Sequence, residues 1–183
     1  MRYDYFCKQI LTPEECIEIR NLFFKNLNAE LQDIPTQGAS KTSDVYIANY
    51  KNIKTALKKV EDFVLSVNEK YFRYNLHDLK DDDMLILDAY DSNKNGQHGY
   101  HKHQTDFNED FDFKLTALIN ISDYHYEGGH LKIFDGKGEH TVDEFQKEGT
   151  VCILPSYTLH ATNNTTLGVK KIITQLYTGP RFK

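Results

Sequence analysis

The sequence has no tryptophan, little cysteine and no long apolar run. Its three cysteines, Cys7, Cys16 and Cys152, form no Cys-x-x-Cys pair, which argues against a disulfide framework or a structural zinc knot. No segment approaches the roughly 20 apolar residues that a membrane span needs. The first ten residues mix charge with aromatic side chains and lack the apolar core of a signal peptide. We therefore expect a cytoplasmic protein with no membrane contact.

Positive charge is also in short supply. The 22 Lys and Arg residues face 27 Asp and Glu residues, a net charge of −5, which disfavours a nucleic acid as partner. The 183 residues, 39% of them hydrophobic, suffice for one core and are too few for two. We expect a single domain over residues 1–183, whose oligomeric state the sequence does not determine.

Two helices are predicted in the first 75 residues or so. Thr12-Pro13-Glu14-Glu15 combines an N-cap Thr, a Pro at the first helical position and a Glu three residues after the Thr. Apolar residues at helical spacing extend this helix over about 13–31, and a second apolar face predicts a helix over about 53–72. The polar segment between them, 33–43, is predicted to be an exposed loop.

After Asp83 the pattern becomes that of short strands separated by turn-forming residues. The apolar or alternating runs are Met84–Tyr90, Phe113–Ile121, Leu131–Phe134, Thr150–Leu154 and Ile172–Tyr177. Helices followed by many strands predict a mainly β, α+β fold: an antiparallel sandwich or barrel with helices packed on one outer face. The helical part would cover about 1–75 and the β core about 84–180.

Histidine is the residue type that stands out. Three of the eight histidines lie between His98 and His103, Asp106 follows shortly after, and His160 lies much further along the chain. Two imidazoles and one carboxylate on one side of a metal, with other positions open, suit Fe(II). A local cluster of histidines is also common on solvated polar loops, so the cluster alone leaves both interpretations open.

Several residues and motifs surround these histidines in a definite order along the chain: Tyr90, His103, Asp106, Tyr126–Leu131, Leu154–Ser156, His160, Gly168, Lys170 and Gly179–Phe182. Their order resembles the prolyl 4-hydroxylase-like group of Fe(II)/2-oxoglutarate-dependent dioxygenases, and the end of the chain is similar to the small phage and bacterial members. The resemblance covers nearly the whole chain. It implies a double-stranded β-helix (a jelly roll, as in cupins), and the metal ligands His103, Asp106 and His160.

One departure from the family affects the ligand set. The family has one residue between the His and the Asp, whereas Gln104 and Thr105 separate His103 from Asp106. Because strand side chains alternate, residues three apart do not share a face unless a bulge or turn intervenes. His101 is the alternate ligand, which would give a three-histidine site, and Thr105 in the carboxylate position is a third solution.

The resemblance also implies a co-substrate site. Lys170 lies ten residues after His160, where the family places the cation that binds the far carboxylate of 2-oxoglutarate. Tyr90 and Asn120 match positions that line the co-substrate pocket, and Thr116 lies on the same strand face as Asn120. The resemblance implies no catalytic residue beyond the metal ligands. The cofactors would be Fe(II) and 2-oxoglutarate, and the use of ascorbate stays open.

The expected function is hydroxylation of a substrate C–H bond with O2, while 2-oxoglutarate is converted to succinate and CO2. The resemblance favours a peptidyl proline in another protein or peptide over a small metabolite. The polar segments 33–43 and 91–99 would form the rim of the site. The alternatives are a non-catalytic metal- or ligand-binding barrel with a broken iron site, and a metal-dependent isomerase or hydrolase of similar shape.

Overall fold

The computed structural model describes residues 4–32, 40–105 and 110–182, with backbone alone at 29–32. Its first half contains β1 (Phe6–Gln9), α1 (Pro13–Lys25), β2 (Leu27–Gln32), β3 (Lys41–Thr42), β4 (Asp44–Asn49), α2 (Lys54–Val67), the π-helical turn η2 (Asn68–Phe72), β5 (Met84–Asp91) and β6 (Gln97–His101). Its second half contains β7 (Phe111–Asn120), β8 (Glu127–Gly128), β9 (Leu131–Phe134), β10 (Glu139–Thr141), the 3-10 turn η4 (Asp143–Gln146), β11 (Thr150–Pro155), β12 (Leu159–Thr162), β13 (Thr165–Leu167) and β14 (Val169–Pro180). Short 3-10 turns η1 (Tyr50–Asn52) and η3 (Ser92–Lys94) complete the set.

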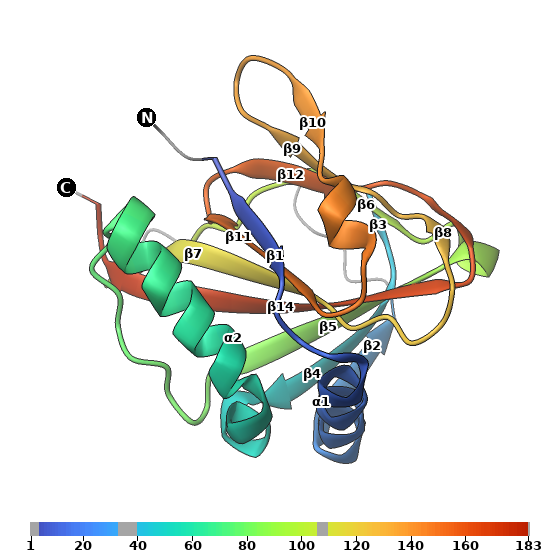
Figure 1. Cartoon of the computed structure of the whole chain (residues 1–183), viewed down its shortest axis with the longest axis horizontal. Helices are drawn as coiled ribbons and strands as arrows, with labels where there is room; N and C mark the ends of the chain where they lie inside the picture. The colour runs from blue at the N-terminus through green and yellow to red at the C-terminus, as the bar shows by residue number, and fades with distance from the viewer. Residues whose placement is uncertain (1–3, 33–39, 106–109, 183) are drawn as a thin grey trace.

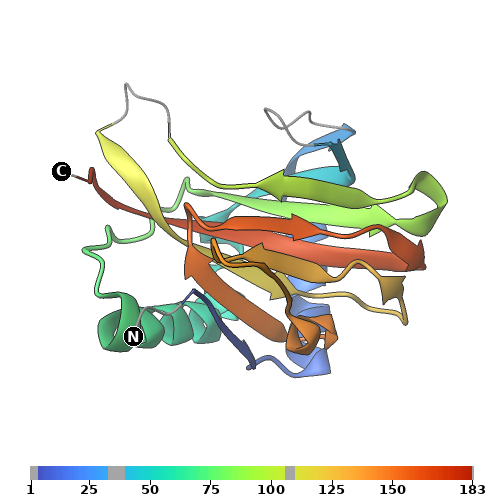
Figure 2. The same ribbon diagram turned by 90° about the horizontal axis from the view of Figure 1, so that it is seen from above.

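Two antiparallel sheets face each other. The larger has the strand order β1-β11-β7-β14-β5-β4-β2, and the smaller has the order β10-β9-β12-β6-β3. The view from above shows the long strands of the two sheets running roughly along one another (Figure 2). Neighbouring strands are mostly distant in sequence, as β14 is from β5 and β12 from β6. This arrangement is a double-stranded β-helix, so the predicted fold class is confirmed.

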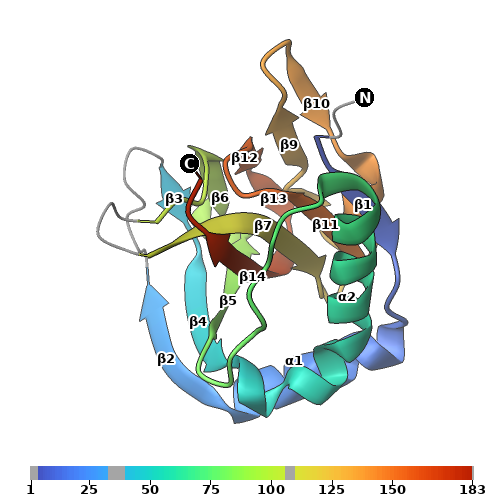
Figure 3. The same cartoon turned by 90° about the vertical axis from the view of Figure 1, so that its left-hand side faces the viewer.

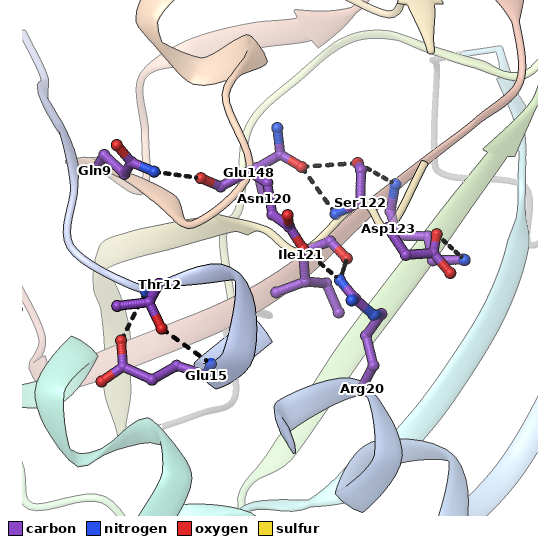
Figure 4. Close-up of polar contacts among 10 residues, drawn as sticks. Gln9, Thr12, Glu15, Arg20, Asn120, Ile121, Ser122, Asp123 and Glu148 are labelled. Carbon is purple, nitrogen blue, oxygen red and sulfur yellow. Dashed lines mark hydrogen bonds and ion pairs between the residues drawn. The ribbon is translucent and has the colours of Figure 1, made fainter. Parts of the chain in front are cut away.

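The two N-terminal helices cover the outer face of the larger sheet (Figures 1 and 3). The predicted capping box is present at the start of α1: the Glu15 N–H donates to Thr12 Oγ1 (3.3 Å) and the Thr12 N–H donates to Glu15 Oε2 (2.7 Å). Arg20 fastens this helix to the barrel, because its Nη1 donates to the Ile121 carbonyl (2.6 Å) and to Glu148 Oε1 (2.7 Å) (Figure 4).

Strand alternation divides the apolar interior into two clusters. Along β14, Ile173 belongs to the cluster that packs against α1 and α2, whereas Ile172 belongs to the cluster between the two sheets. Along β5, Leu87 faces the helices and Tyr90 faces the inside of the barrel. One face of the larger sheet therefore packs against the helices, and the other faces the interior between the two sheets.

Two predictions about element bounds are wrong. The first helix ends at Lys25 and not near 31, because the Asn26 side chain caps the Leu22 carbonyl (2.7 Å) and the chain continues as β2. Leu27 and Leu31 are four apart, a spacing that suits both a helix face and one face of a strand. The predicted loop over 33–43 lies partly outside the described residues, but its end forms β3 and the Ser43 side chain is buried.

The predicted strands after Asp83 are all confirmed, although most extend by one to three residues at their ends. A tight turn at Asn95-Gly96 joins η3 to β6. Asn95 has a φ of 54°, and a side chain on Gly96 would meet the Asp91 nitrogen at 2.5 Å. None of the helices in the described part of the chain has the length and apolar character to cross a bilayer.

Candidate metal centre in the barrel

A cavity of about 130 Å³ lies inside the barrel, between the two sheets. The smaller sheet contributes five residues, all of them polar: Lys41 from β3, His98 and His101 from β6, and His160 and Thr162 from β12. The larger sheet contributes alternate residues of β5 and β14, and Leu118 of β7. The full lining is Lys41, Ile86, Asp88, Tyr90, His98, His101, His103, Leu118, His160, Thr162, Ile172 and Thr174.

Three of these imidazoles converge. One ring nitrogen from each of His101, His103 and His160 lies within 4.8 Å of the corresponding atoms of the other two. His101 and His160 are register partners across β6 and β12, with ring centroids 4.3 Å apart. The His103 ring lies 5.2 Å from each of the other two rings. Pairing between strands thus brings together residues that are almost sixty positions apart in the chain.

Backbone carbonyls orient two of the rings. His101 Nδ1 lies 2.9 Å from the Gly99 carbonyl, and His160 Nδ1 lies 2.9 Å from the Thr158 carbonyl. A carbonyl accepts hydrogen bonds only, so each Nδ1 carries the proton and each Nε2 keeps its lone pair. The second nitrogen of a metal-binding histidine is held in this way in most sites. Within the described residues, His103 and His160 each have a buried Nε2 with no hydrogen-bond partner, which is the state expected of a nitrogen whose lone pair binds a metal ion.

Burial keeps the imidazoles neutral. It lowers the pKa of His103 to about 3 and that of His98 to about 2, with the neighbouring histidines adding to the shift. Burial also lowers the pKa of His101, and it lowers the pKa of His160 well below its ordinary value. Neutral imidazole is the form that binds a metal. Imidazole nitrogen suits Fe, and also Zn, Cu and Ni.

The predicted carboxylate ligand is not placed by this structure, because Asp106 lies outside the described residues. Thr105, the other residue considered for that position, is half-buried. Its hydroxyl lies 3.0 Å from the Phe111 carbonyl and 3.3 Å from Asp112 Oδ1, both at the start of β7. Among the described residues that could supply a third donor, His101 is therefore the one that joins His103 and His160.

A buried ion pair forms part of the cavity wall. Lys41 Nζ and Asp88 Oδ1 are 2.6 Å apart, with side chains 6% and 7% exposed. Ser43 Oγ donates to the same Asp88 oxygen (3.0 Å), and Tyr90 is hydrogen-bonded to Asp88 and Thr162. Burial, followed by the charge of Asp88, raises the pKa of Tyr90 well above its ordinary value. Tyr90 is therefore a neutral phenol on the cavity wall.

Lys170 points into the barrel and is fully buried. Its Nζ donates to the Gly129 carbonyl (2.6 Å) and to Gln146 Oε1 (2.8 Å), and it lies 4.8 Å from the centre of the Phe145 ring. It is the register partner of Tyr90 but is not among the residues that line the cavity. Burial lowers the pKa of Lys170 to about 7. The neighbouring Lys171 points away and pairs with Asp123 (2.5 Å).

The two β7 residues predicted at the co-substrate site are buried, but they are engaged elsewhere. Thr116 Oγ1 shares a hydrogen bond with Ser156 Oγ (2.9 Å), and Asn120 Nδ2 donates to the Phe145 carbonyl (2.7 Å) and to Tyr126 Oη (2.9 Å). Leu118, on the same strand face, is the β7 residue that lines the cavity.

Sequence reasoning missed several cavity residues. Strand alternation from Tyr90 and Lys170 could have found Asp88 and Thr174, because each lies an even number of positions away on the same strand face. His98 lies in the local cluster that first indicated a metal. No local signal distinguishes Lys41, which reaches the cavity through the pairing of β3 with β6.

Comparison with known proteins finds the fold but no close relative. No protein-family model matches the sequence, and no curated protein is significantly similar to it. A Pseudomonas putida prolyl-4-hydroxylase structure superposes with a TM-score of 0.67 at 13% identity, covering 99% of this chain and 94% of that one. The viral collagen prolyl hydroxylase of Paramecium bursaria Chlorella virus-1, in complex with 2-oxoglutarate, gives 0.67 at 17%, covering 97% of both chains.

A third similar structure contains a peptide. It is a Trichoplax adhaerens prolyl hydroxylase in complex with a fragment of the hypoxia inducible factor oxygen degradation domain, with a TM-score of 0.68 at 13% identity over 95% of this chain and 83% of that one. This chain has the fold of the prolyl 4-hydroxylase-like Fe(II)/2-oxoglutarate oxygenases. The resemblance noted in the sequence is thereby confirmed at the level of fold.

Proposed function

We propose that this protein is an Fe(II)/2-oxoglutarate-dependent dioxygenase. The observation that carries the proposal is the convergence of His101, His103 and His160 inside the barrel, with two Nε2 atoms buried and unpartnered. The fold, shared with oxygenases of this type, supports the same conclusion. Fe(II) with 2-oxoglutarate would supply the oxidising chemistry that converts O2, the co-substrate and a C–H bond into succinate, CO2 and a hydroxylated product.

The protein's own contribution begins with the ligand set. His103 and His160 would hold the metal, with the third position filled by Asp106, as the family pattern implies, or by His101, which the structure brings within reach. The two choices differ in charge, because a carboxylate neutralises one of the two positive charges of the ion and an imidazole neutralises none.

Lys170 would bind the far carboxylate of 2-oxoglutarate. Its ammonium is buried among aromatic rings and has two neutral oxygens as partners, so an incoming carboxylate would give it a charge-assisted bond in a shielded site. Tyr90, the register partner of Lys170, would donate its hydroxyl proton to the same ligand. Asn120 binds Phe145 and Tyr126 beside Lys170 and would support this end of the site, and Thr116 would support the strand near Ser156.

The substrate we propose is a peptidyl proline in an exposed segment of another protein. One similar structure is described as a viral collagen prolyl hydroxylase. Another is described as a prolyl hydroxylase in complex with a peptide fragment of a hypoxia inducible factor. The exposed apolar side chains of Tyr157 and Leu159 also line a surface depression at the start of β12, on which a peptide could pack.

The proposed function is tested by adding Fe(II) and 2-oxoglutarate without oxygen and recording the visible spectrum, then admitting O2 and measuring succinate. A charge-transfer band that needs both additions, followed by succinate, is the expected result. His103→Ala and His160→Ala should lose both, and His125→Ala, whose side chain is 76% exposed, should lose neither. Binding of metal without any response to 2-oxoglutarate would favour a non-catalytic barrel instead.

A further inference from the structure

Two of the three cysteines face each other across neighbouring strands. Cys7 of β1 and Cys152 of β11 are direct register partners in an antiparallel ladder. Opposite residues in such a ladder have Cα atoms about 4.5 or about 5.5 Å apart, depending on the hydrogen-bonding position. Both separations lie within the range of roughly 4.4–6.8 Å that a disulfide spans.

The two side chains point to the same side of the sheet. Cys152 is fully buried in the apolar cluster between the two sheets, and Cys7 is half-buried and packs against that cluster. The backbone pairing and the side-chain directions therefore both bring the sulfur atoms together.

The register of this pair is held from the end of β1. Gln9 Nε2 donates to the Glu148 carbonyl (3.0 Å), as Figure 4 shows. The N–H groups of Ile10 and Leu11 both donate to the Gly149 carbonyl, at 3.0 and 3.1 Å. These bonds fix the end of β1 and the two residues after it against the two residues that precede β11, which keeps Cys7 opposite Cys152.

Cys7 is also reachable from solvent. It lines a surface depression together with Thr150 of β11 and with Glu144 and Gln146 of η4. Gln146 is the residue whose side chain accepts a hydrogen bond from Lys170. The thiol pair thus lies on the barrel wall beside Lys170, with Cys7 half-buried at a surface depression and Cys152 fully buried behind it.

We propose that Cys7 and Cys152 form a modification site for thiol–disulfide exchange with a small-molecule disulfide, ending in an intramolecular cross-strand bond. The Cys7 thiolate attacks one sulfur of the reagent, so that a mixed disulfide forms and one small thiol leaves. The Cys152 sulfur then attacks Cys7, and the second small thiol leaves. The two protein thiols lose two protons and two electrons, and the reagent gains both as two thiols.

The bond would fasten an edge strand. β1 lies at the end of the larger sheet and pairs with β11 through four register positions, so it can open without breaking other pairings. A covalent link at its second residue removes that opening. The inference does not depend on the proposed enzymatic activity, because it concerns strand pairing and thiol chemistry alone.

The experiment treats the full chain with oxidised glutathione, alkylates the remaining thiols and maps them by mass spectrometry. We expect the number of free thiols to fall from three to one, with Cys7 and Cys152 linked within one chain and Cys16 still free. Cys16→Ser should form the same bond, because Cys16 is buried alone in α1. Cys152→Ser should stop at the mixed disulfide on Cys7, and Cys7→Ser should not react.

Hydrogen exchange provides the second readout. In the bonded form the amides of residues 6–9 should exchange at least about tenfold more slowly than in the reduced form, and dithiothreitol should reverse the change. The inference is overturned if the wild-type chain stops at a mixed disulfide, stays fully reduced, forms bonds between chains or uses Cys16. Unchanged exchange in the bonded form would overturn the claim that the bond secures β1.

Discussion

The four imidazoles of the cavity are uncharged and closely packed, and their arrangement provides little stability of its own. Two buried Nε2 atoms forgo the hydrogen bonds they would have in water, a loss of about 1–3 kcal/mol each. The carbonyls of Gly99 and Thr158 nevertheless hold two of the rings in a fixed tautomer. At the residue scale the site is therefore suited to a group that accepts imidazole lone pairs, as the metal ion of the proposed function would.

Lys170 predicts a pH dependence of stability. The folded protein holds its pKa at about 7, below the ordinary value of 10.5, so between these values the unfolded chain binds a proton that the folded chain does not. Stability should then rise with pH across this window and be lowest below pH 7. Lys170→Met removes this contribution to the pH dependence of stability. We compare the free energy of unfolding of the variant with that of wild type by urea denaturation. The difference, variant minus wild type, should be more positive at pH 6 than at pH 10 by on the order of a few kcal/mol. A difference between variant and wild type that does not change with pH would contradict the prediction.

The Lys41–Asp88 pair predicts a large effect of a single substitution. Lys41→Met leaves the Asp88 carboxylate buried without a cation, which should lower the free energy of unfolding by about 3–5 kcal/mol. Lys54→Met is the matched control, because its pair with Asp81 is 50% and 66% exposed and should contribute no more than about 1 kcal/mol. Equal losses in the two variants, measured by urea denaturation, would show that the buried pair has no special role.

The part of the site that the sequence predicts is the part that local motifs encode. His103 and His160 were placed by their motifs, and the inward direction of Lys170 relative to Lys171 follows from strand alternation. Lys41 could not be predicted, because its contact with Asp88 joins two strands of different sheets. The third ligand stays open between Asp106 and His101, since the extra residue after His103 allows either.

At the scale of elements, the start of α1 is encoded locally. The Thr12 and Glu15 bonds satisfy two N–H groups that a helix leaves unpaired. Thr12→Ala should therefore cost about 1 kcal/mol of stability in chemical denaturation. Ser66→Ala, at an exposed position within α2, should change stability by less than about 0.5 kcal/mol. A loss no greater than that of Ser66→Ala would mean that helix packing, and not the cap, holds this end.

The sequence predicted five strands of the β core from their apolar runs and missed others. Among the missed strands are β6 and β12, which carry His101 and His160 and are rich in polar residues, and β3 and β8, which have two residues each and leave no periodic pattern. The end of α1 was misplaced because the spacing of Leu27 and Leu31 fits both a helix and a strand. Neighbours in the sheet decided the outcome, since β2 pairs with β4 along its length.

At the scale of the whole molecule, the larger sheet separates stability from chemistry. Its outer face carries the helices and the larger apolar cluster, and its inner face lines the cavity. The smaller sheet brings two of the three converging histidines to the opposite wall, and His103 follows directly after β6. The metal site thus depends on closure of the barrel and not on one loop, which predicts that metal binding stabilises the whole fold.

The most direct test of this account is an anaerobic calorimetric titration of the metal-free protein with Fe(II). We expect one ion per chain. His103→Ala and His160→Ala should each weaken binding by more than about 100-fold, because each removes a ligand that the structure holds in place. His125→Ala should bind as the wild type does. Binding that persists unchanged in both the His103 and the His160 variants would place the ion elsewhere and contradict the account.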